Sequence, residues 1–539
     1  MSASSKKKLR SAEQAAKMTE KQLTEQKEAK KLKLYSTLAV VVLAVFVVFA
    51  AYVGISRTIT NSGIRERNTV ALTIGEHEIS NAELNYYYVN AVNEFYSQNA
   101  NYAGLFGLDM TKPLNENIMS EETGETWADY FVDYAIENIK ATYALVDEAK
   151  ANGYTLPEEA VTEIDNAMAT MKMYAAMYGY TDAKSYLKAM YGNGTTEEGL
   201  RNYYEMTELA NHYQQHYQES LTYTADELAA ADAADSKQYN SYYYNYYYLN
   251  VYNFIEGDND AATEYTPEQT AAAVEAAEAA AKSLVESSTT VEELNAAIAA
   301  LPVNAENPSA ASYVSSGVSY SSINSLYADW VADESRKAGD ITYVASTSTD
   351  GNGNETVAGY YVVMFGSKND NTYPLANVRH ILVAFEGGTY DSTYGTTTYS
   401  DEEKAAAWEA AEAILNEWKA GEATEESFAA LANEKSADGD GTTGGLYEDI
   451  YPGQMVAAFE DWCFADHEVG DTGIVETEYG CHVMFYAGDS ETTYRNHLIS
   501  NKLANDTFSA WYTELTEAVT VEKQNCQYLS LDLVLSPAV

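Results

Sequence analysis

The chain has 539 residues, which is long enough for two to four domains with separate hydrophobic cores. Its formal net charge is −49, from 81 acidic and 32 basic residues, so its surface repels phosphate backbones and nucleic acid is not an expected partner. A hydrophobic content of 46% with 47 tyrosines argues against wholesale disorder.

The N-terminus combines a basic tail with an apolar run. Residues 1–34 hold ten basic and four acidic residues, and no charged residue follows until Arg57. The uninterrupted apolar segment 38–55 is close to the roughly 20 residues that cross a bilayer, whereas a buried helix of a soluble protein rarely lacks any polar side chain over such a length. Because basic residues stay on the cytoplasmic side, we expect a cytoplasmic tail and an uncleaved transmembrane signal anchor at 35–56, with the bulk of the chain outside the cell membrane.

A mostly helical domain is predicted over residues 57–230. The stretch VALTIGEHEIS at 70–80 is expected to form a short strand and a turn, after which Asn81 can cap a helix. Further helices are predicted in this region at 127–151, 157–178 and 182–190.

The middle of the chain contains an internal repeat. Residues 325–344 align with 458–475, with a tryptophan and a Gly-Asp pair at matching places, and downstream GYYVVMF (359–365) matches GCHVMFY (480–486). The order of the elements before them also matches, because each copy is predicted as a strand, three helices and two strands.

Each copy also carries a signal for the start of its first long helix. The motif Thr-Pro-Glu-Gln at 266–269 and the pair Ser400 and Glu403 are both capping boxes. Two tandem domains of one small α/β fold are therefore expected, over 235–370 and 372–489.

The C-terminal segment 490–539 is predicted to contain a helix at 491–520 and a strand in CQYLSLDLVL at 526–535. Three cysteines are too few for a disulfide framework. We expect them to be packing residues, with a bridge between Cys463 and Cys481 as the alternative.

Four motifs in the second copy resemble one known family. They are NVRHILV (377–383), SADGDGTTGGL (436–446), YPGQMVAAFEDWCF (451–464) and GDTGIVETEYGCHVMFY (470–486). In this order they make residues 372–489 similar to a parvulin-type peptidyl-prolyl isomerase (rotamase) domain. The layout of the chain also resembles the PrsA/SurA group of extracytoplasmic foldases, in which a helical chaperone domain built from both chain ends flanks the parvulin.

The resemblance implies an α+β protein with an N-terminal transmembrane helix and a chaperone-like domain, 57–230, completed by 490–539. Two tandem parvulin-like domains follow from the repeat, the first degenerate and the second intact. It implies catalytic positions for four residues: His380, Asp438, Tyr479 and His482. It implies substrate-binding positions for four more, which would form or border a proline pocket: Gln454, Met455, Phe459 and Phe464. Asp440 competes with Asp438 for its place, because GGLYEDI replaces the more usual GGDLG of the family.

The chemistry of isomerisation fits these residue types. Rotation about a peptide bond costs roughly 18–20 kcal/mol because the bond is partly double, and X-Pro bonds exchange over tens of seconds or more. Catalysis then needs an apolar slot for the pyrrolidine ring and a polar environment that favours the twisted amide, so neither a metal nor a cofactor is expected. Methionine adapts to irregular apolar shapes, and two neutral histidines on adjacent strands can share a hydrogen bond.

The first copy departs from the family pattern. Tyr361 falls opposite His482, Ile323 opposite Met455 and Tyr327 opposite Phe459, and the strand at its start contains no histidine. We expect it to keep the fold without the catalytic set; it would serve either as a tyrosine-lined peptide-binding module or as a spacer.

The sequence therefore favours a membrane-anchored peptidyl-prolyl cis–trans isomerase that acts on unfolded or partly folded secreted polypeptides with X-Pro bonds. The alternative is a non-catalytic, membrane-anchored holdase chaperone. A cell-surface scaffold is a third reading, and whether the chain forms a homodimer is left open.

Overall fold

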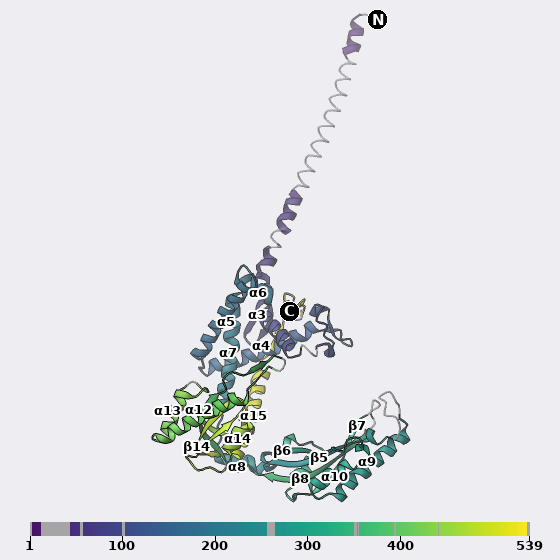
Figure 1. Cartoon of the computed structure of the whole chain (residues 1–539). Coiled ribbons are helices and arrows are strands. Elements are labelled where there is room, and N and C mark those ends of the chain that lie inside the picture. The colour runs from purple at the N-terminus through teal and green to yellow at the C-terminus, as the bar shows by residue number, and fades with distance from the viewer. Residues whose placement is uncertain are drawn as a thin grey trace. The chain divides into compact units, whose positions relative to one another are not determined.

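The computed structural model describes most of the chain (Figure 1). The described residues are 3–11, 44–53, 56, 58–99, 103–255, 265–349, 353, 355–392, 395–439 and 441–535. Contacts divide the chain into two compact units, one made of Met1–Leu221 with Thr507–Val539 and the other of Thr222–Asp506. Most of the predicted cytoplasmic tail (1–34) and much of the predicted anchor (35–56) lie outside the described residues.

Within the described residues, one helix is long and apolar enough to cross a membrane. It spans Ala44–Ser62, and its most apolar stretch is not buried against other parts of the protein. A signal sequence near an N-terminus passes the same test of length and composition, so the helix fits a membrane anchor without fixing a topology. The short helix α2, Ile64–Asn68, follows it.

The first unit contains a three-stranded antiparallel sheet of order β15-β1-β2. Its strands are β1 (Val70–Ile74), β2 (His77–Ser80) and β15 (Val521–Lys523). The predicted strand and turn at 70–80 is therefore a hairpin, and the C-terminal part of the chain supplies the third strand.

The C-terminal strand predicted at 526–535 is wrong. That stretch makes only one isolated bridge, between Val534 and Pro113. Its alternating leucines pack on the core of the first unit, with Leu529 and Leu535 buried, although the backbone is irregular. The alternation of apolar residues in this stretch reflects burial of one side of the chain, although its backbone does not pair as a strand.

Long helices make up most of the first unit. They are α3 (Asn81–Asn99), α4 (Trp127–Ala151), α5 (Glu158–Met177), α6 (Ala183–Tyr191), α7 (Glu197–Ser220) and the C-terminal part of α15 (Tyr494–Glu517). The three predicted helices agree with α4, α5 and α6 to within one residue at each end. On α15, the Trp511 ring stacks on Tyr217 of α7 with 3.8 Å between ring centroids. Shorter elements are the 3-10 helices Ala103–Phe106 and Leu114–Glu116 and the strands β3 (Ile118–Ser120) and β4 (Glu125–Thr126).

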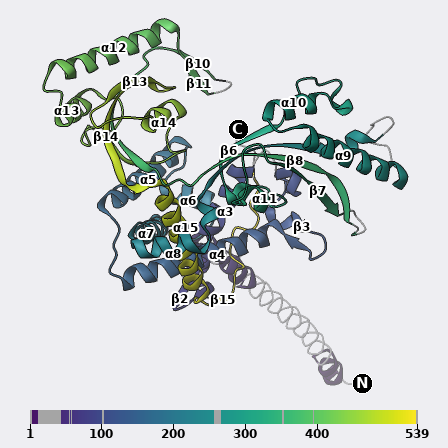
Figure 2. The same ribbon diagram turned by 90° about the horizontal axis from the view of Figure 1, so that it is seen from below.

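The second unit contains two four-stranded antiparallel sheets with the same strand order (Figure 2). The first has the order β6-β5-β8-β7, built from β5 (Ser241–Asn250), β6 (Tyr313–Ser319), β7 (Ile341–Thr349) and β8 (Glu355–Asn369). The second has the order β12-β9-β14-β13, built from β9 (Pro374–Ala384), β12 (Leu446–Ile450), β13 (Thr472–Glu476) and β14 (Gly480–Thr493). A two-stranded hairpin, β10 (Thr389–Asp391) and β11 (Thr396–Thr398), follows β9.

Each copy contains one strand that was not predicted from the sequence. Strands β6 and β12 lie at the edges of their sheets, between the second and third predicted helices. β6 has no buried residue and β12 has one, Ile450, so neither shows the apolar alternation by which a strand is recognised. Each copy therefore has two long helices, a strand and then a short helix before its last two strands.

The helices of the second unit are α8 (Ala225–Ala234), then α9 (Pro267–Ser287), α10 (Val291–Ala299) and α11 (Ala328–Ala332) in the first copy, and α12 (Asp401–Ala420), α13 (Glu425–Lys435) and α14 (Ala457–Cys463) in the second. The long helices α9 and α12 begin where their capping boxes predict. Both predicted capping boxes are confirmed: Thr266 with Gln269 caps α9, and Ser400 with Glu403 caps α12.

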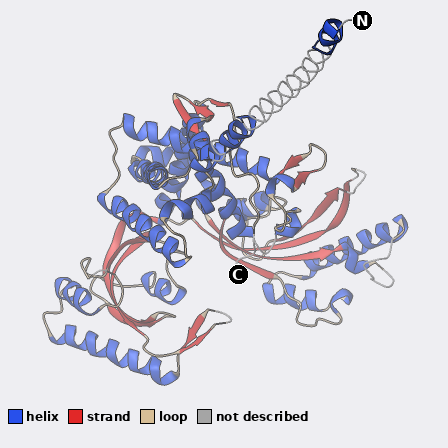
Figure 3. Ribbon diagram, turned by 90° about the horizontal axis from the view of Figure 1, so that it is seen from above, coloured by secondary structure: helices blue, strands red, loops and turns tan. Residues whose placement is uncertain are grey.

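Helices cover both faces of the second sheet (Figure 3). Side chains of α12 and α13 pack with Ile381, Val483 and other residues of one face. The short helix α14 packs on the opposite face, around Val378 and Met484. Cys463 and Cys481 belong to these two different clusters, and both are free thiols, so the alternative bridge between them is not formed.

Arg495, in the first turn of α15, joins the connecting segments of the second unit. Its side chain is 7% exposed, and its guanidinium group pairs with the carboxylate of Asp232 in α8. One terminal nitrogen donates to Asn240 Oδ1 at 2.9 Å and to the Asp370 carbonyl at 2.8 Å, and the other donates to the Ser236 carbonyl at 3.0 Å. The same side chain therefore holds the segment that enters the first copy and the segment that leaves it.

Asn371 completes this junction. It is 1% exposed and has a positive φ of 60°, a conformation that asparagine tolerates better than most residues. Its side-chain nitrogen donates to the Tyr239 carbonyl and to Ser241 Oγ, both at 2.9 Å, and its carbonyl accepts the Arg495 backbone N–H at 2.6 Å.

Candidate active site

Two buried histidines face one another on adjacent strands of the second sheet. His380 in β9 is 3% exposed and His482 in β14 is 5% exposed. His380 pairs across the strands with Met484, so the two histidines are diagonal neighbours on the same face. Their Nδ1 atoms are 3.1 Å apart.

The outer nitrogens of the pair also have partners, which fix the direction of the hydrogen bonds. His380 Nε2 lies 3.1 Å from Asp438 Oδ2, and His482 Nε2 lies 2.8 Å from Thr477 Oγ1. Because a carboxylate only accepts, His380 carries its proton on Nε2 and accepts at Nδ1. His482 then donates from Nδ1, and its Nε2 accepts the Thr477 hydroxyl. Both histidines are neutral in this arrangement.

Burial keeps both imidazoles neutral. Desolvation lowers the pKa of His380, although Asp438 opposes the shift. Desolvation, followed by the neighbouring His380, lowers the pKa of His482 to about 4. Asp438 is held in turn by the Tyr447 hydroxyl, which donates to Oδ2 at 2.8 Å.

These pKa shifts predict a pH dependence of stability. His482 has an ordinary pKa of 6.5 and a folded-state pKa of about 4, so between these values the unfolded chain binds more protons than the folded one. The stabilisation that comes from the neutral pair is complete above pH 6.5 and is lost as the pH falls toward 4. We therefore expect the melting temperature of wild type to approach that of His482→Gln as the pH is lowered through this window, measured by thermal unfolding at half-unit steps. Parallel curves for the two proteins would contradict the shift.

Aromatic rings surround the pair. Phe459 of α14 is 3% exposed and stands edge-on to both imidazoles, with centroids 5.3 Å from His380 and 5.2 Å from His482. Tyr447 stacks on His380 at 4.9 Å. Met455, partly buried, packs in the same cluster as Phe459. The result is an apolar cluster packed on two neutral histidines that share a hydrogen bond.

The sequence of this region matches a known family. Residues 360–486 match the family model described as the PPIC-type PPIase domain. This is a PPIC-type, or parvulin-type, peptidyl-prolyl isomerase domain. The match begins within β8, upstream of the predicted boundary at 372.

The chain is also similar to two solved peptidyl-prolyl isomerases called PrsA. The structure from Bacillus cereus is 25% identical, and the alignment covers 28% of this chain and 50% of that one with a TM-score of 0.17. The structure from Bacillus anthracis is 19% identical, with 28% and 59% covered and a TM-score of 0.17. The alignments thus span between half and three fifths of these chains, and scores this low establish no shared overall fold. No curated protein matches the chain.

The predicted site residues of the PPIC-type domain fall into two groups. The structure brings together His380, His482, Asp438 and Phe459, with Met455 in the cluster around Phe459. Asp440, the competitor of Asp438, lies outside the described residues.

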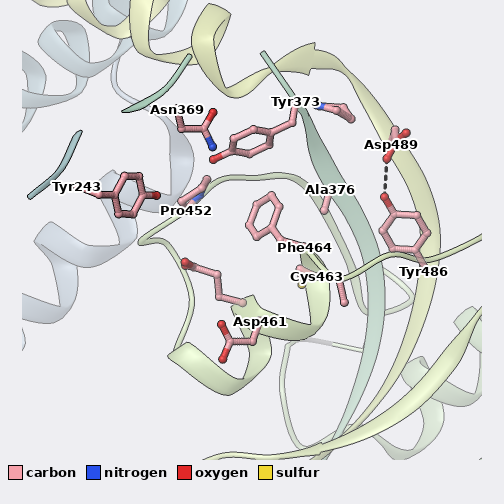
Figure 4. Close-up of a pocket in the computed structure, with 13 residues that line it drawn as sticks. Tyr243, Asn369, Tyr373, Ala376, Pro452, Asp461, Cys463, Phe464, Tyr486 and Asp489 are labelled. Carbon is pink, nitrogen blue, oxygen red and sulfur yellow. Dashed lines mark hydrogen bonds between the residues drawn. The ribbon is translucent and has the colours of Figure 1, made fainter. Parts of the chain in front are cut away.

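The other three predicted residues lie apart from the histidine pair. Tyr479 is 60% exposed, and its backbone N–H donates to Thr477 Oγ1. Gln454 is exposed, and its side-chain oxygen accepts the Tyr451 N–H. Phe464 packs against the same cluster as Phe459 and Met455, stands edge-on to Tyr373 with 6.0 Å between ring centroids, and lines a pocket of about 500 Å³ (Figure 4).

Two residues of the PPIC-type domain's network were not predicted. Thr477 donates a hydrogen bond to His482, and Tyr447 donates one to Asp438, so these two residues bind the two ends of the hydrogen-bonded series. Thr477 stands two residues before Tyr479, in a motif that was already singled out, and Tyr447 stands in the GGLYEDI departure from the family pattern. In the sequence, each of the two residues is recognisable only as a side chain with a hydroxyl. The group that each hydroxyl contacts is seen only in the fold.

The loop before β12 is closely fitted to the strand that carries His380. Gly445 has φ +65°, and its carbonyl accepts the His380 N–H at 2.9 Å. A Cβ at Gly445 would lie 2.2 Å from the His380 carbonyl oxygen, so only glycine fits without moving β9.

In the first copy, tyrosines stand where the second has its histidines. Val475 pairs with His482 between β13 and β14, and Val344 pairs with Tyr361 between β7 and β8. Since these two valines end the aligned segments, the strand register places Tyr361 at the position of His482. The Tyr327 and Tyr361 rings are 5.5 Å apart, as Phe459 and His482 are in the second copy at 5.2 Å.

Proposed function

We propose that the chain is a membrane-anchored foldase that catalyses X-Pro isomerisation in polypeptides outside the cell membrane. The observation that carries this proposal is the hydrogen-bonded series of Asp438, His380, His482 and Thr477 beneath Phe459, inside a PPIC-type domain.

Phe459 and Met455 suit the proline ring of a substrate. Both are apolar, and they pack in one cluster on the α14 side of the sheet. A planar amide owes its barrier to electron delocalisation from nitrogen to oxygen, and an apolar wall withdraws the water that favours the charge-separated form. The bound X-Pro bond is then stabilised in its twisted state relative to its planar one.

The polar groups beneath the wall act as a fixed support. Asp438 is held by two donors, His380 Nε2 and the Tyr447 hydroxyl, so its carboxylate does not need to reorganise when a substrate arrives. The two neutral histidines connect Asp438 to Thr477 through hydrogen bonds, and they add no second charge under the substrate. No covalent step is involved.

The N-terminal helix Ala44–Ser62 supports anchorage in the membrane. We propose a single pass, with the basic tail 1–34 in the cytoplasm and the domains outside, because basic flanks remain on the cytoplasmic side. The substrates we propose are unfolded or partly folded secreted polypeptides. A surface with net charge −49 favours encounter with basic segments.

The first copy is proposed to be a degenerate relative of the PPIC-type domain. Its ring cluster around Tyr327, Tyr361 and Tyr246 supports a peptide-binding role over a mere spacer, because tyrosine offers flat contact area and a hydroxyl that can donate or accept.

A protease-free isomerisation assay on the full chain in detergent micelles tests the proposal. We expect faster cis-to-trans exchange of a Xaa-Pro peptide, proportional to protein concentration. If exchange is not accelerated while the chain still suppresses aggregation of an unfolded polypeptide, the non-catalytic holdase is the correct function.

A further inference from the structure

The turn between α5 and α6 exposes an apolar patch at one end of the first unit. Met173, Met177 and Tyr178 are 57, 60 and 66% exposed. Tyr174 and Tyr180 are exposed beside them. The Tyr174 and Tyr178 rings are 6.1 Å apart, so the patch is continuous and not a set of scattered side chains. Patches of this kind mark an interaction surface.

The same segment is basic in a strongly acidic chain. Residues 166–196 contain three lysines and one aspartate, whereas the whole chain carries a net charge of −49. The aspartate, Asp182, is occupied as the N-cap of α6. Lys172 pairs with Glu197 at 2.8 Å, and Lys184 and Lys188 are exposed on α6. The apolar patch is thus bordered by two exposed positive charges.

The patch also lies near the C-terminal end of the proposed anchor helix. Gly63 directly follows the helix Ala44–Ser62, and a Cβ on Gly63 would lie 2.3 Å from Gly194 Cα, so the two backbones touch. Arg67 donates to the Gly194 carbonyl at 3.2 Å. Gly194 comes just after α6, whose nine residues span about 13 Å at 1.5 Å per residue. In Figure 1, α6 lies beside the purple segment that contains α2.

We infer that the α5–α6 turn is a second membrane contact, which inserts Met177 and Tyr178 into the interface of an anionic bilayer. Tyrosine is favoured at the level of lipid headgroups, and methionine supplies apolar area that can enter the acyl boundary. Lys184 and Lys188 match anionic headgroups. This inference rests on the proposed anchorage, and it adds that the first unit is held against the membrane instead of swinging on its anchor.

Nanodiscs provide the test with the full chain. An environment-sensitive fluorophore is attached to Met177→Cys, and the same fluorophore on Glu159→Cys, at the other end of α5, is the matched control; labelled wild type gives the background from native thiols. In discs containing phosphatidylglycerol we expect blue-shifted emission at 177 and quenching by brominated acyl chains, at least threefold stronger than in phosphatidylcholine discs. The fluorophore at position 159 should report an aqueous environment in both kinds of disc.

A charge variant checks the source of the lipid preference. Lys184→Gln/Lys188→Gln is expected to remove most of the difference between the two lipids, whereas Lys282→Gln/Lys419→Gln, which removes two exposed lysines elsewhere, should leave it unchanged. An aqueous signal at 177 in both lipids overturns the inference. A response to an unfolded polypeptide without a response to lipid overturns it in favour of a client-binding surface.

Anchorage is measured separately, by co-elution of the chain with the discs. If the chain does not co-elute, the proposed anchor is wrong, and the labelled chain is then mixed with preformed vesicles of the same two compositions. If the fluorophore at 177 responds to those vesicles, the membrane contact is supported without the anchor. If it remains in an aqueous environment, both the contact and the anchor are rejected.

Discussion

Replacing His482 by alanine is expected to lower kcat/KM of the full chain for a Xaa-Pro peptide by at least tenfold. The change removes the acceptor of the Thr477 hydroxyl and the donor to His380 Nδ1, and so leaves a buried nitrogen of His380 without its partner. A buried unpaired group costs about 1–3 kcal/mol, and roughly 1.4 kcal/mol expressed at the transition state is a factor of ten. Met455→Ala should also lower kcat/KM, but by removing part of the apolar cluster that would hold the proline ring.

Two further variants separate catalysis from folding. Thr477→Val keeps the side-chain shape and removes the hydroxyl that donates to His482 Nε2, so we expect a smaller loss of kcat/KM and a smaller fall in melting temperature than in His482→Ala. His467→Ala is the matched control, since the His467 ring packs at a tilt against Trp462 in the same domain, 4.2 Å between centroids, and does not contact the pair. If His482→Ala remains folded and retains more than half of the activity, the histidine pair is not part of the catalytic site.

Replacing Arg495 by alanine is expected to destabilise the second unit by about 3 kcal/mol. The loss leaves the Asp232 carboxylate, the Asn240 side chain and the Asp370 carbonyl without their common donor, and breaking a buried pair from one side typically costs about 3–5 kcal/mol. We place the effect at the lower end because Asp232 is partly exposed. Arg495→Lys should recover little, because an ammonium group cannot reach four partners in one plane.

Limited proteolysis together with thermal unfolding measures this effect. We expect cleavage of Arg495→Ala near residues 232–240 and 370–371, while the isomerase domain itself continues to act on short peptides. Lys502→Ala is the control in the same helix, because its exposed pair with Asp506 is worth less than about 1 kcal/mol. Equal protease resistance of wild type and Arg495→Ala would show that the junction does not depend on this side chain.

Much of the fold could be predicted because its signals are local. Capping boxes at Thr266 and Ser400 place the starts of α9 and α12, and apolar spacing places α4, α5 and α6. The edge strands β6 and β12 could not be found in this way, since they are held by backbone pairing to β5 and β9 and bury few side chains. The leucines at 529–535 led to the wrong prediction of a strand for the opposite reason. They are buried, but their backbone does not pair in a sheet.

The candidate site shows the same division. His380 and His482 could be named as a pair because each lies in a motif that resembles the parvulin family, and the structure places their nitrogens in contact. Thr477 and Tyr447 could not be assigned, because their importance comes from contacts across the fold with His482 and Asp438. Phe464, five residues after Phe459, packs against the same hydrophobic cluster and also lines a pocket beside Tyr373, a contact that the sequence does not reveal.

The Arg495 junction has a consequence for how chain length can vary in this protein. A single guanidinium nitrogen binds Asn240 and Asp370, so the polypeptide leaves for the first copy and returns from it at nearly the same point. The first copy is thus inserted between two segments that Arg495 holds close together, and its Tyr243 and Asn369 also line a pocket with Tyr373 of the second copy. Insertions are tolerated best where both ends already meet and the inserted segment folds by itself. We therefore expect changes of length within the first copy, away from these two segments, to leave the strands that support the histidines in place.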